Sequence, residues 1–120
     1  MSKKTVVLGA SENPARYSNM AVKRLRAHGH EVVAIGKQAG QIGDVTIQKE
    51  QTGEAGVDTV TVYLNPAHQQ QYEDYILKLH PRRIIFNPGA ENEALAQKVK
   101  AQGIEPVEAC TLVLLTTNQF

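Results

Sequence analysis

Hydrophobic and polar positions form alternating blocks along the chain, and the length of each block suits a strand or a helix. Short runs rich in apolar and β-branched residues occur at 5–8, 31–35, 59–64, 83–86 and 105–108, with a less regular run at 45–47. Buried strands have this length and composition. The pattern therefore predicts five main strands, and the run at 45–47 would be a short addition inside a glycine-rich loop.

Between these runs, apolar residues recur at helical spacing. Ser18 or Asn19 is expected to cap a first helix that runs to about His28, and Asn65 with Pro66 forms an N-cap and N1 pair for a second helix. Two more helices are expected near 95–99 and 110–117. The predicted apolar positions are Ala21, Val22 and Leu25, then Tyr72, Tyr75, Ile76 and Leu79, then Leu95, Ala96 and Val99.

This order of strands and helices implies parallel strands joined by right-handed crossovers, with helices on both faces of one sheet. We predict an α/β fold: a three-layer, Rossmann-like, doubly wound parallel sheet of about five strands in the order 3-2-1-4-5. The 120 residues are enough for a single domain, residues 1–120, but too few for a separate substrate domain.

Composition limits the partners. The net charge of +1 gives no strong field that would attract nucleic acid or an anionic membrane, and no apolar run reaches the roughly 20 residues of a membrane span. The single cysteine, Cys110, cannot form an internal disulfide, which suits a reducing, cytoplasmic location. We expect a small-molecule ligand, with a homodimer or an enzyme partner left open.

Ligands of doubly wound sheets bind beyond the carboxyl ends of the strands. Four polar turns are expected at this edge: 9–11, 36–37, 65–66 and 87–90. Gly9 permits close backbone approach, while Ser11, Asn13 and Ser18 supply donors beside a helix N-terminus, which favours phosphate. Any one of these turns alone is most simply a strand-to-helix connection, but four at one edge favour a real site.

The dinucleotide fingerprint is absent. A NAD site needs G-x-G-x-x-G and an acid at the end of the second strand, whereas Gly9 is followed by Ser11 and the nearby Glu31 lies at the opposite edge. At the ligand edge stands Lys37. A cation there suits a phosphorylated ribose, as in NADP or coenzyme A, although a solvated loop lysine is the simpler interpretation of this residue alone.

Several segments resemble one family. The stretches "GASENPARYSNMAVKRL", "GHEVVAIG", "VDTVTVYLNP" and "GAENEALAQKVKAQGIEPVEAC" are similar to the small CoA-binding domain proteins, and to the N-terminal domain of the succinyl-CoA synthetase α subunit. The resemblance covers nearly the whole chain and implies binding of coenzyme A (CoA).

The resemblance also implies roles for particular residues. The pyrophosphate would be cradled by Gly9, Ala10, Ser11, Asn13 and Pro14, with Arg16 and Ser18 close by. The adenosine and its 3′-phosphate would be flanked by Ile35, Gly36 and Lys37. The adenine or pantetheine side would be lined by Leu64, Asn65 and Pro66, and the far wall by Asn87, Pro88, Gly89 and Ala90.

Catalytic chemistry is not evident. The four histidines, His28, His30, His68 and His80, have no metal-ligand spacing and are interpreted as surface residues. His68 could contact a phosphate or thioester, or be a solvated residue at a helix start. Cys110 could be a nucleophile, a disulfide partner for the CoA thiol, or a small buried apolar residue. The histidine phosphorylated in succinyl-CoA synthetases belongs to a later domain, so no catalytic residue and no metal site is assigned.

Three functional hypotheses follow. A stand-alone, non-catalytic module that binds CoA or an acyl-CoA accounts best for the turns, the cation and the resemblance. The first alternative is an enzyme, or a subunit of one, that handles NADP or another nucleotide. The second is a ligand-sensing interaction protein in which the bound nucleotide changes a homodimer or partner surface.

Overall fold

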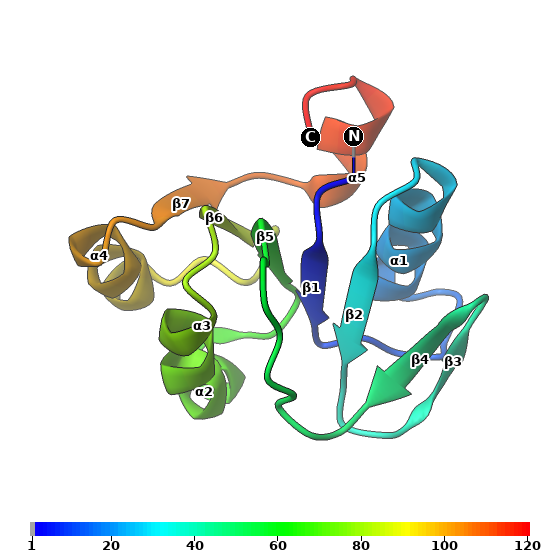
Figure 1. The fold of residues 1–120 in the computed structure, drawn as a ribbon, viewed down its shortest axis with the longest axis horizontal. Helices are drawn as coiled ribbons and strands as arrows, with labels where there is room; N and C mark the ends of the chain where they lie inside the picture. Colours follow the sequence, from blue (N-terminus) through cyan, green and yellow to red (C-terminus); the bar gives the residue numbers. More distant parts are fainter. Residues whose placement is uncertain (1) are drawn as a thin grey trace.

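A seven-stranded sheet runs through the middle of the computed structural model, which describes residues 2–120 (Figure 1). The strand order is β3-β4-β2-β1-β5-β6-β7, and β3 alone runs antiparallel to its neighbour. The strands are β1 (Thr5–Leu8), β2 (Val32–Ile35), β3 (Gly40–Ile42), β4 (Val45–Gln48), β5 (Thr59–Val62), β6 (Arg83–Phe86) and β7 (Glu105–Glu108).

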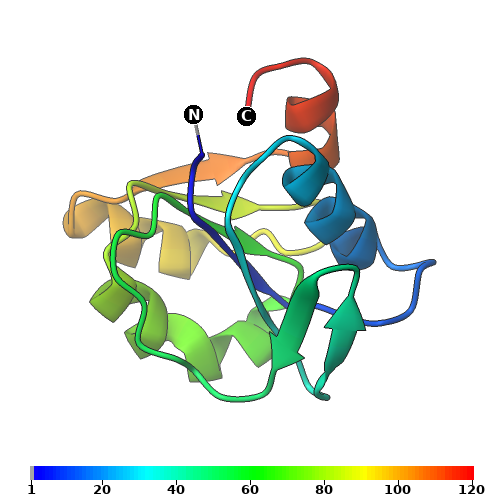
Figure 2. The same cartoon turned by 45° about the vertical axis from the view of Figure 1, so that its right-hand side comes forward.

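Helices cover both faces of the sheet, which gives three layers (Figures 1 and 2). One face is covered by α1 (Tyr17–Ala27) and α5 (Thr111–Thr116). The other is covered by α2 (Pro66–Gln69), the 3₁₀ turn η1 (Gln70–Tyr72), α3 (Glu73–Leu79) and α4 (Glu93–Ala101). The α/β class and the helices on both faces are confirmed, and a strand lies at each of the five predicted main positions. The sheet is mixed rather than purely parallel, because β3 is antiparallel to β4.

The predicted strand number and order were wrong. Counted along the chain, the five main strands are β1, β2, β5, β6 and β7, and they lie in the order 2-1-3-4-5. β4, which was expected only as a short addition inside a loop, pairs with β2 and is a full member of the sheet. With β3, β4 forms a hairpin joined by Gly43 and Asp44. The glycines of this segment suggested a loop, yet Ile42, Val45 and Ile47 are buried. These three side chains pack in one core with Val22 and Leu25 of α1.

The buried central strand explains why the two faces form together. All four residues of β1 are inaccessible, and side chains alternate between faces along a strand. Val6 and Leu8 therefore join the core beneath α3 and α4, while Val7 joins the core beneath α1 and α5. Because each core shares β1, neither helical layer can detach without exposing apolar surface on the central strand.

The first helix begins earlier than predicted. It starts at Tyr17 after Arg16, whose side chain makes no capping bond, and Ser18 and Asn19 lie buried within the first turn. Asn19 uses its amide differently: Nδ2 donates to the Ser11 carbonyl at 2.9 Å. The residue types typical of caps are thus used to hold the preceding loop against the helix.

His30 is not a surface residue, which corrects the prediction for this histidine. The residue is 8% exposed, its ring centroid lies 5.1 Å from that of Phe120, and its Nδ1 accepts the Lys3 backbone N–H at 2.9 Å. Burial, reinforced by the charges of Lys3, His28 and Arg83, lowers the pKa of His30. The neutral ring is therefore the form that the fold requires.

Stability should fall below neutral pH because of this ring. The unfolded chain protonates His30 near its ordinary pKa of about 6.5, while the folded chain resists protonation until a lower pH. The contribution of His30 to the free energy of unfolding is therefore fully present above about pH 6.5 and decreases as the pH falls toward the pKa of the folded state. Urea titrations at a series of pH values should show a smaller decrease in His30→Gln than in the natural protein. An identical decrease in both would contradict this assignment.

Candidate functional site

A cavity of about 690 Å³ opens at the carboxyl edge of the sheet, at the point where the chain leaves β1 for one face and β5 for the other. Such a reversal is where doubly wound proteins bind ligands. Three segments line the cavity. They are the first turn with the start of α1, the turn after β2 and the segment after β5: Gly9–Asn13 and Arg16–Ser18; Gly36–Ala39; and Tyr63–Asn65, His68, Gln71 and Tyr72.

The structure brings together most of the predicted binding residues. Ten line this cavity: Gly9, Ala10, Ser11, Asn13, Arg16, Ser18, Gly36, Lys37, Leu64 and Asn65. Seven do not: Pro14, Ile35, Pro66, Asn87, Pro88, Gly89 and Ala90. Three of the four predicted turns therefore converge, and the turn after β6 stands apart.

The first turn lies directly on the end of β2. The backbone N–H groups of Gly9 and Ala10 both donate to the Ile35 carbonyl, at 2.9 and 3.0 Å. Gly36 makes this approach possible, since a Cβ there would overlap the Ala10 carbonyl oxygen. The two amides are consequently occupied, so the donors available to a ligand must come from later in the loop.

Further along, the loop is stabilised by its own side chains. Ser11 Oγ accepts the Asn13 N–H at 3.1 Å, and Asn13 Oδ1 accepts the Ala15 N–H at 3.0 Å. Among residues 2–120, no acceptor is present for the backbone N–H groups of Ser11, Glu12, Tyr17 and Ser18. The first turn of a helix leaves such groups free, and together with the helix dipole they attract anions.

The opposite wall is built by the start of α2. Asn65 Oδ1 accepts the His68 N–H at 3.0 Å, which confirms the predicted cap and holds His68 at the cavity. Beneath it, the buried Gln69 donates from Nε2 to the carbonyls of Leu64 and Ala90, both at 2.7 Å. Gln69 thereby joins the turn after β5 to the turn after β6.

Asn87 has an internal role. Its Nδ2 donates to Thr61 Oγ1 at 2.7 Å and to the Val62 carbonyl at 2.9 Å, and its Oδ1 accepts the Thr111 N–H at 2.9 Å. The hydroxyls of Thr61 and Thr111 lie 2.8 Å apart. This buried network connects β5, β6 and α5, which explains the amide at this position without a ligand.

Aromatic residues that the sequence did not single out for binding also line the cavity. Tyr17 is 69% exposed on α1, and Tyr63 and Tyr72 contribute from the other side. The Tyr63 hydroxyl is buried without a hydrogen-bond partner in the described chain, and burial raises its pKa to about 12. In the sequence, only their positions could have indicated a place at the cavity: Tyr17 directly follows the first loop, and Tyr63 directly precedes Leu64 and Asn65.

The two candidate reactive side chains, His68 and Cys110, differ in their position relative to the cavity. His68 lines the cavity, whereas Cys110 is half-buried at the start of α5 and does not line it. Of the alternatives left open for Cys110, a small buried apolar residue is met only in part, because the side chain is half-buried. Within residues 2–120, no three His, Cys, Asp or Glu side chains gather as a metal site would need. The lining instead carries the cations Arg16 and Lys37 and one carboxylate, Glu12.

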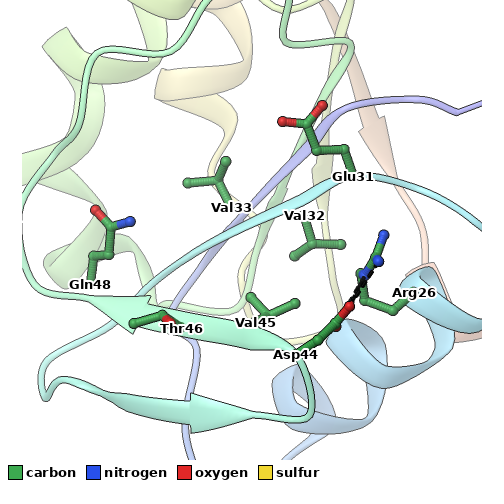
Figure 3. Close-up of a pocket in the computed structure, with 8 residues that line it drawn as sticks. All are labelled: Arg26, Glu31, Val32, Val33, Asp44, Val45, Thr46 and Gln48. Atoms are coloured by element: carbon green, nitrogen blue, oxygen red, sulfur yellow. Dashed lines mark hydrogen bonds and ion pairs between the residues drawn. The ribbon is translucent and has the colours of Figure 1, made fainter.

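A second hollow, of about 280 Å³, lies where β2 and β4 separate (Figure 3). The two strands pair only at their carboxyl halves, and Val32, Val33 and Val45 lie in the gap. Arg26 donates to both carboxylate oxygens of Asp44, at 2.8 to 3.3 Å, across one end. Since this cation is already paired, the hollow does not offer the charge that a phosphate needs.

The family is decided by a match along almost the whole chain. A family model described as a CoA binding domain matches residues 3–116. The chain belongs to the CoA-binding domain family, which is found in succinyl-CoA synthetase α subunit-like proteins. The resemblance inferred from the sequence is thus confirmed. No curated protein matches the chain at a significant level.

Solved structures support the fold of this CoA-binding domain. A crystal structure of an uncharacterized protein is 47% identical, with a TM-score of 0.97, over 100% of this chain and 99% of that one. A Thermus thermophilus protein is 22% identical (TM-score 0.86, 99% and 91% covered), and a hypothetical protein from Pyrococcus horikoshii OT3 is 20% identical (TM-score 0.84, 93% and 80% covered). The last two show the fold alone. None of the described helices is long and apolar enough to cross a membrane.

Replacing Tyr63 with phenylalanine should leave the free protein as stable as before or more stable by about 1 kcal/mol. A buried hydroxyl without a partner costs free energy, and Tyr63→Phe removes it while keeping the ring. Urea unfolding measures the difference, and Tyr75→Phe provides the matched control. The Tyr75 hydroxyl donates to the Thr52 carbonyl at 2.7 Å, so its loss should destabilise the fold. Equal destabilisation by both changes would show that Tyr63 is hydrogen-bonded after all.

Proposed function

We propose that this CoA-binding domain holds CoA or an acyl-CoA in the cavity at the carboxyl edge, as a stand-alone, non-catalytic module. The observation that carries the proposal is that Ser11, Glu12, Tyr17 and Ser18 line the cavity with backbone N–H groups that no described residue accepts. The lining also carries the cations Arg16 and Lys37. Membership of the family points to the same ligand class.

The pyrophosphate would bind at the start of α1. Because the Gly9 and Ala10 amides are bonded to β2, the diphosphate would be held by the loop beyond them and by the first turn of the helix. Arg16 precedes that helix, is exposed and lines the cavity, so its guanidinium can approach a phosphate oxygen. The other loop members, Asn13 and Pro14, shape the turn.

The adenosine end would lie over β2. Gly36 lines the cavity at the end of β2, and Lys37 stands beside it with no acidic partner within salt-bridge distance in residues 2–120. An unpaired lysine at this point suits the 3′-phosphate that distinguishes CoA from most dinucleotides. Leu64 and Tyr72, on the wall toward α2, would contact the pantetheine.

A non-catalytic role fits the positions of the reactive groups. Cys110 stays outside the cavity, and the His68 ring receives no orienting hydrogen bond from the described residues. A Bacillus cereus oxidoreductase shares the fold at 14% identity and a TM-score of 0.58, which says nothing of a shared reaction. The free state of the single cysteine is consistent with a cytoplasmic location.

Isothermal titration with CoA, acetyl-CoA, NAD and NADP tests this function. The proposal expects saturable binding of the two CoA compounds and much weaker binding of NAD. Tight binding of NADP with no heat from either CoA compound would instead favour the nucleotide-dependent enzyme. Sedimentation with and without CoA would reveal whether the ligand also changes an oligomer, as a sensing protein requires.

The Lys37→Ala variant should bind CoA roughly fivefold more weakly, the effect of one exposed ion pair worth about 1 kcal/mol. Dephospho-CoA lacks the 3′-phosphate, so its affinity should change less than about twofold. The matched control is Lys100→Ala, which removes an exposed lysine of α4 outside the cavity. An equal loss for both ligands would remove the assigned contact with the 3′-phosphate.

A further inference from the structure

Among the described residues, Glu12 is the only acidic side chain that lines the cavity, and a strand of the sheet holds it in place. Its Oε2 accepts the backbone N–H of Gln41, in the edge strand β3, at 2.9 Å. A carboxylate from the first turn is thereby carried across the end of β2 to the wall formed by Gly36–Ala39. No local sequence pattern predicts this contact, since 29 positions separate the two residues.

The contact depends on the absence of a side chain at Gly40. A Cβ there would overlap the carboxyl end of Glu12. Only one carboxylate oxygen is used by Gln41, and the described chain provides neither a donor nor a cation for the other, Oε1. The side chain thus presents a free acceptor at the cavity wall.

This acceptor stands where a nucleotide-binding sheet needs one. In dinucleotide-binding proteins an acid at the end of the second strand accepts hydrogen bonds from the ribose. Here that strand ends in Gly36 and Lys37, without an acid. Glu12 comes from the first turn instead, yet it lines the same cavity beside these two residues.

We propose that Glu12 accepts a hydrogen bond from the free ribose 2′-hydroxyl of the bound CoA and so selects for an intact ribose. This inference rests on the proposed function. The two charged side chains then bind neighbouring groups of the ribose: Lys37 binds the 3′-phosphate, and Glu12 binds the 2′-hydroxyl. A carboxylate cannot accept a hydrogen bond from a second phosphate, so the pair also disfavours ribose phosphorylated at both positions.

Calorimetric titration of the full chain with CoA and with 2′-deoxy-CoA tests the assignment. The natural protein should bind CoA about tenfold more tightly, because a hydrogen bond to a charged group is worth about that factor. In Glu12→Ala the two ligands should bind within about twofold of each other. Glu12→Gln keeps an acceptor without the charge, and its preference should be intermediate.

Gly40→Ala is the sharper variant, since it retains the carboxylate and displaces it. The overlapping atoms belong to the flexible end of the Glu12 side chain, so the fold can tolerate the change by moving that end. Its preference for CoA over 2′-deoxy-CoA should fall to that of Glu12→Ala. Glu108→Gln, an exposed carboxylate on β7 outside the cavity, should keep the natural preference.

The outcomes separate the two proposals. If the natural protein binds CoA but does not distinguish it from 2′-deoxy-CoA, the role of Glu12 is wrong and the proposed function stands. If Glu12→Ala weakens both ligands equally, Glu12 only fastens the loop to β3. If the natural protein binds neither ligand, the proposed function fails, and the role of Glu12 fails with it.

Discussion

The approach of the first turn to the end of β2 is the contact on which the site depends. The Ile35 carbonyl accepts two consecutive N–H groups, and Gly36 allows the backbones to come this close. The bend that follows directs the chain across the carboxyl edge before α1 begins at Tyr17. The same contact therefore occupies the N–H groups of Gly9 and Ala10, which could otherwise bind phosphate, and it positions the N–H groups that remain free.

Buried hydrogen bonds hold the turns opposite the helix N-terminus. The turns after β5 and β6 are fastened by Gln69 and Asn87, whose buried amides bond to backbone carbonyls in neighbouring elements. A buried polar network of this kind is stable only when all its members are satisfied. The wall facing the helix N-terminus is consequently preformed, whereas the cations Arg16 and Lys37 are exposed and can adjust to a ligand.

Much of the fold could be predicted because its signals are local. The apolar run of β1 and the Asn65-Pro66 helix start require only neighbouring residues, and both were identified. Of the β3–β4 hairpin, only a short strand at 45–47 was expected and β3 was missed, because the few buried side chains are spaced among glycines. Those side chains pack in one core with Val22 and Leu25 of α1, which no local pattern reports. The burial of His30 likewise depends on Phe120, 90 positions away, and no local pattern reports such packing.

In the candidate site too, residues marked by local turn patterns could be predicted, whereas residues placed by distant contacts could not. Turn chemistry identified Ser11, Gly36 and Asn65, since the residue types themselves mark the bends. It could not identify Glu12 or Tyr63, because a glutamate in a loop and a tyrosine after a strand have many uses. What distinguishes them is visible only in the structure: Glu12 is hydrogen-bonded to a distant strand, and the Tyr63 hydroxyl is buried without a partner among residues 2–120. Asn87 shows the converse, since a polar turn at the right edge is devoted to internal bonds.

The most direct test of the central claim is to follow the backbone amide resonances of ¹⁵N-labelled protein during titration with CoA. We expect the largest shifts at the free N–H groups of Ser11, Glu12, Tyr17 and Ser18, with little change at 88–90. Shifts concentrated instead around Val33 and Thr46, in the hollow between β2 and β4, or no shifts at any CoA concentration, would contradict the central claim.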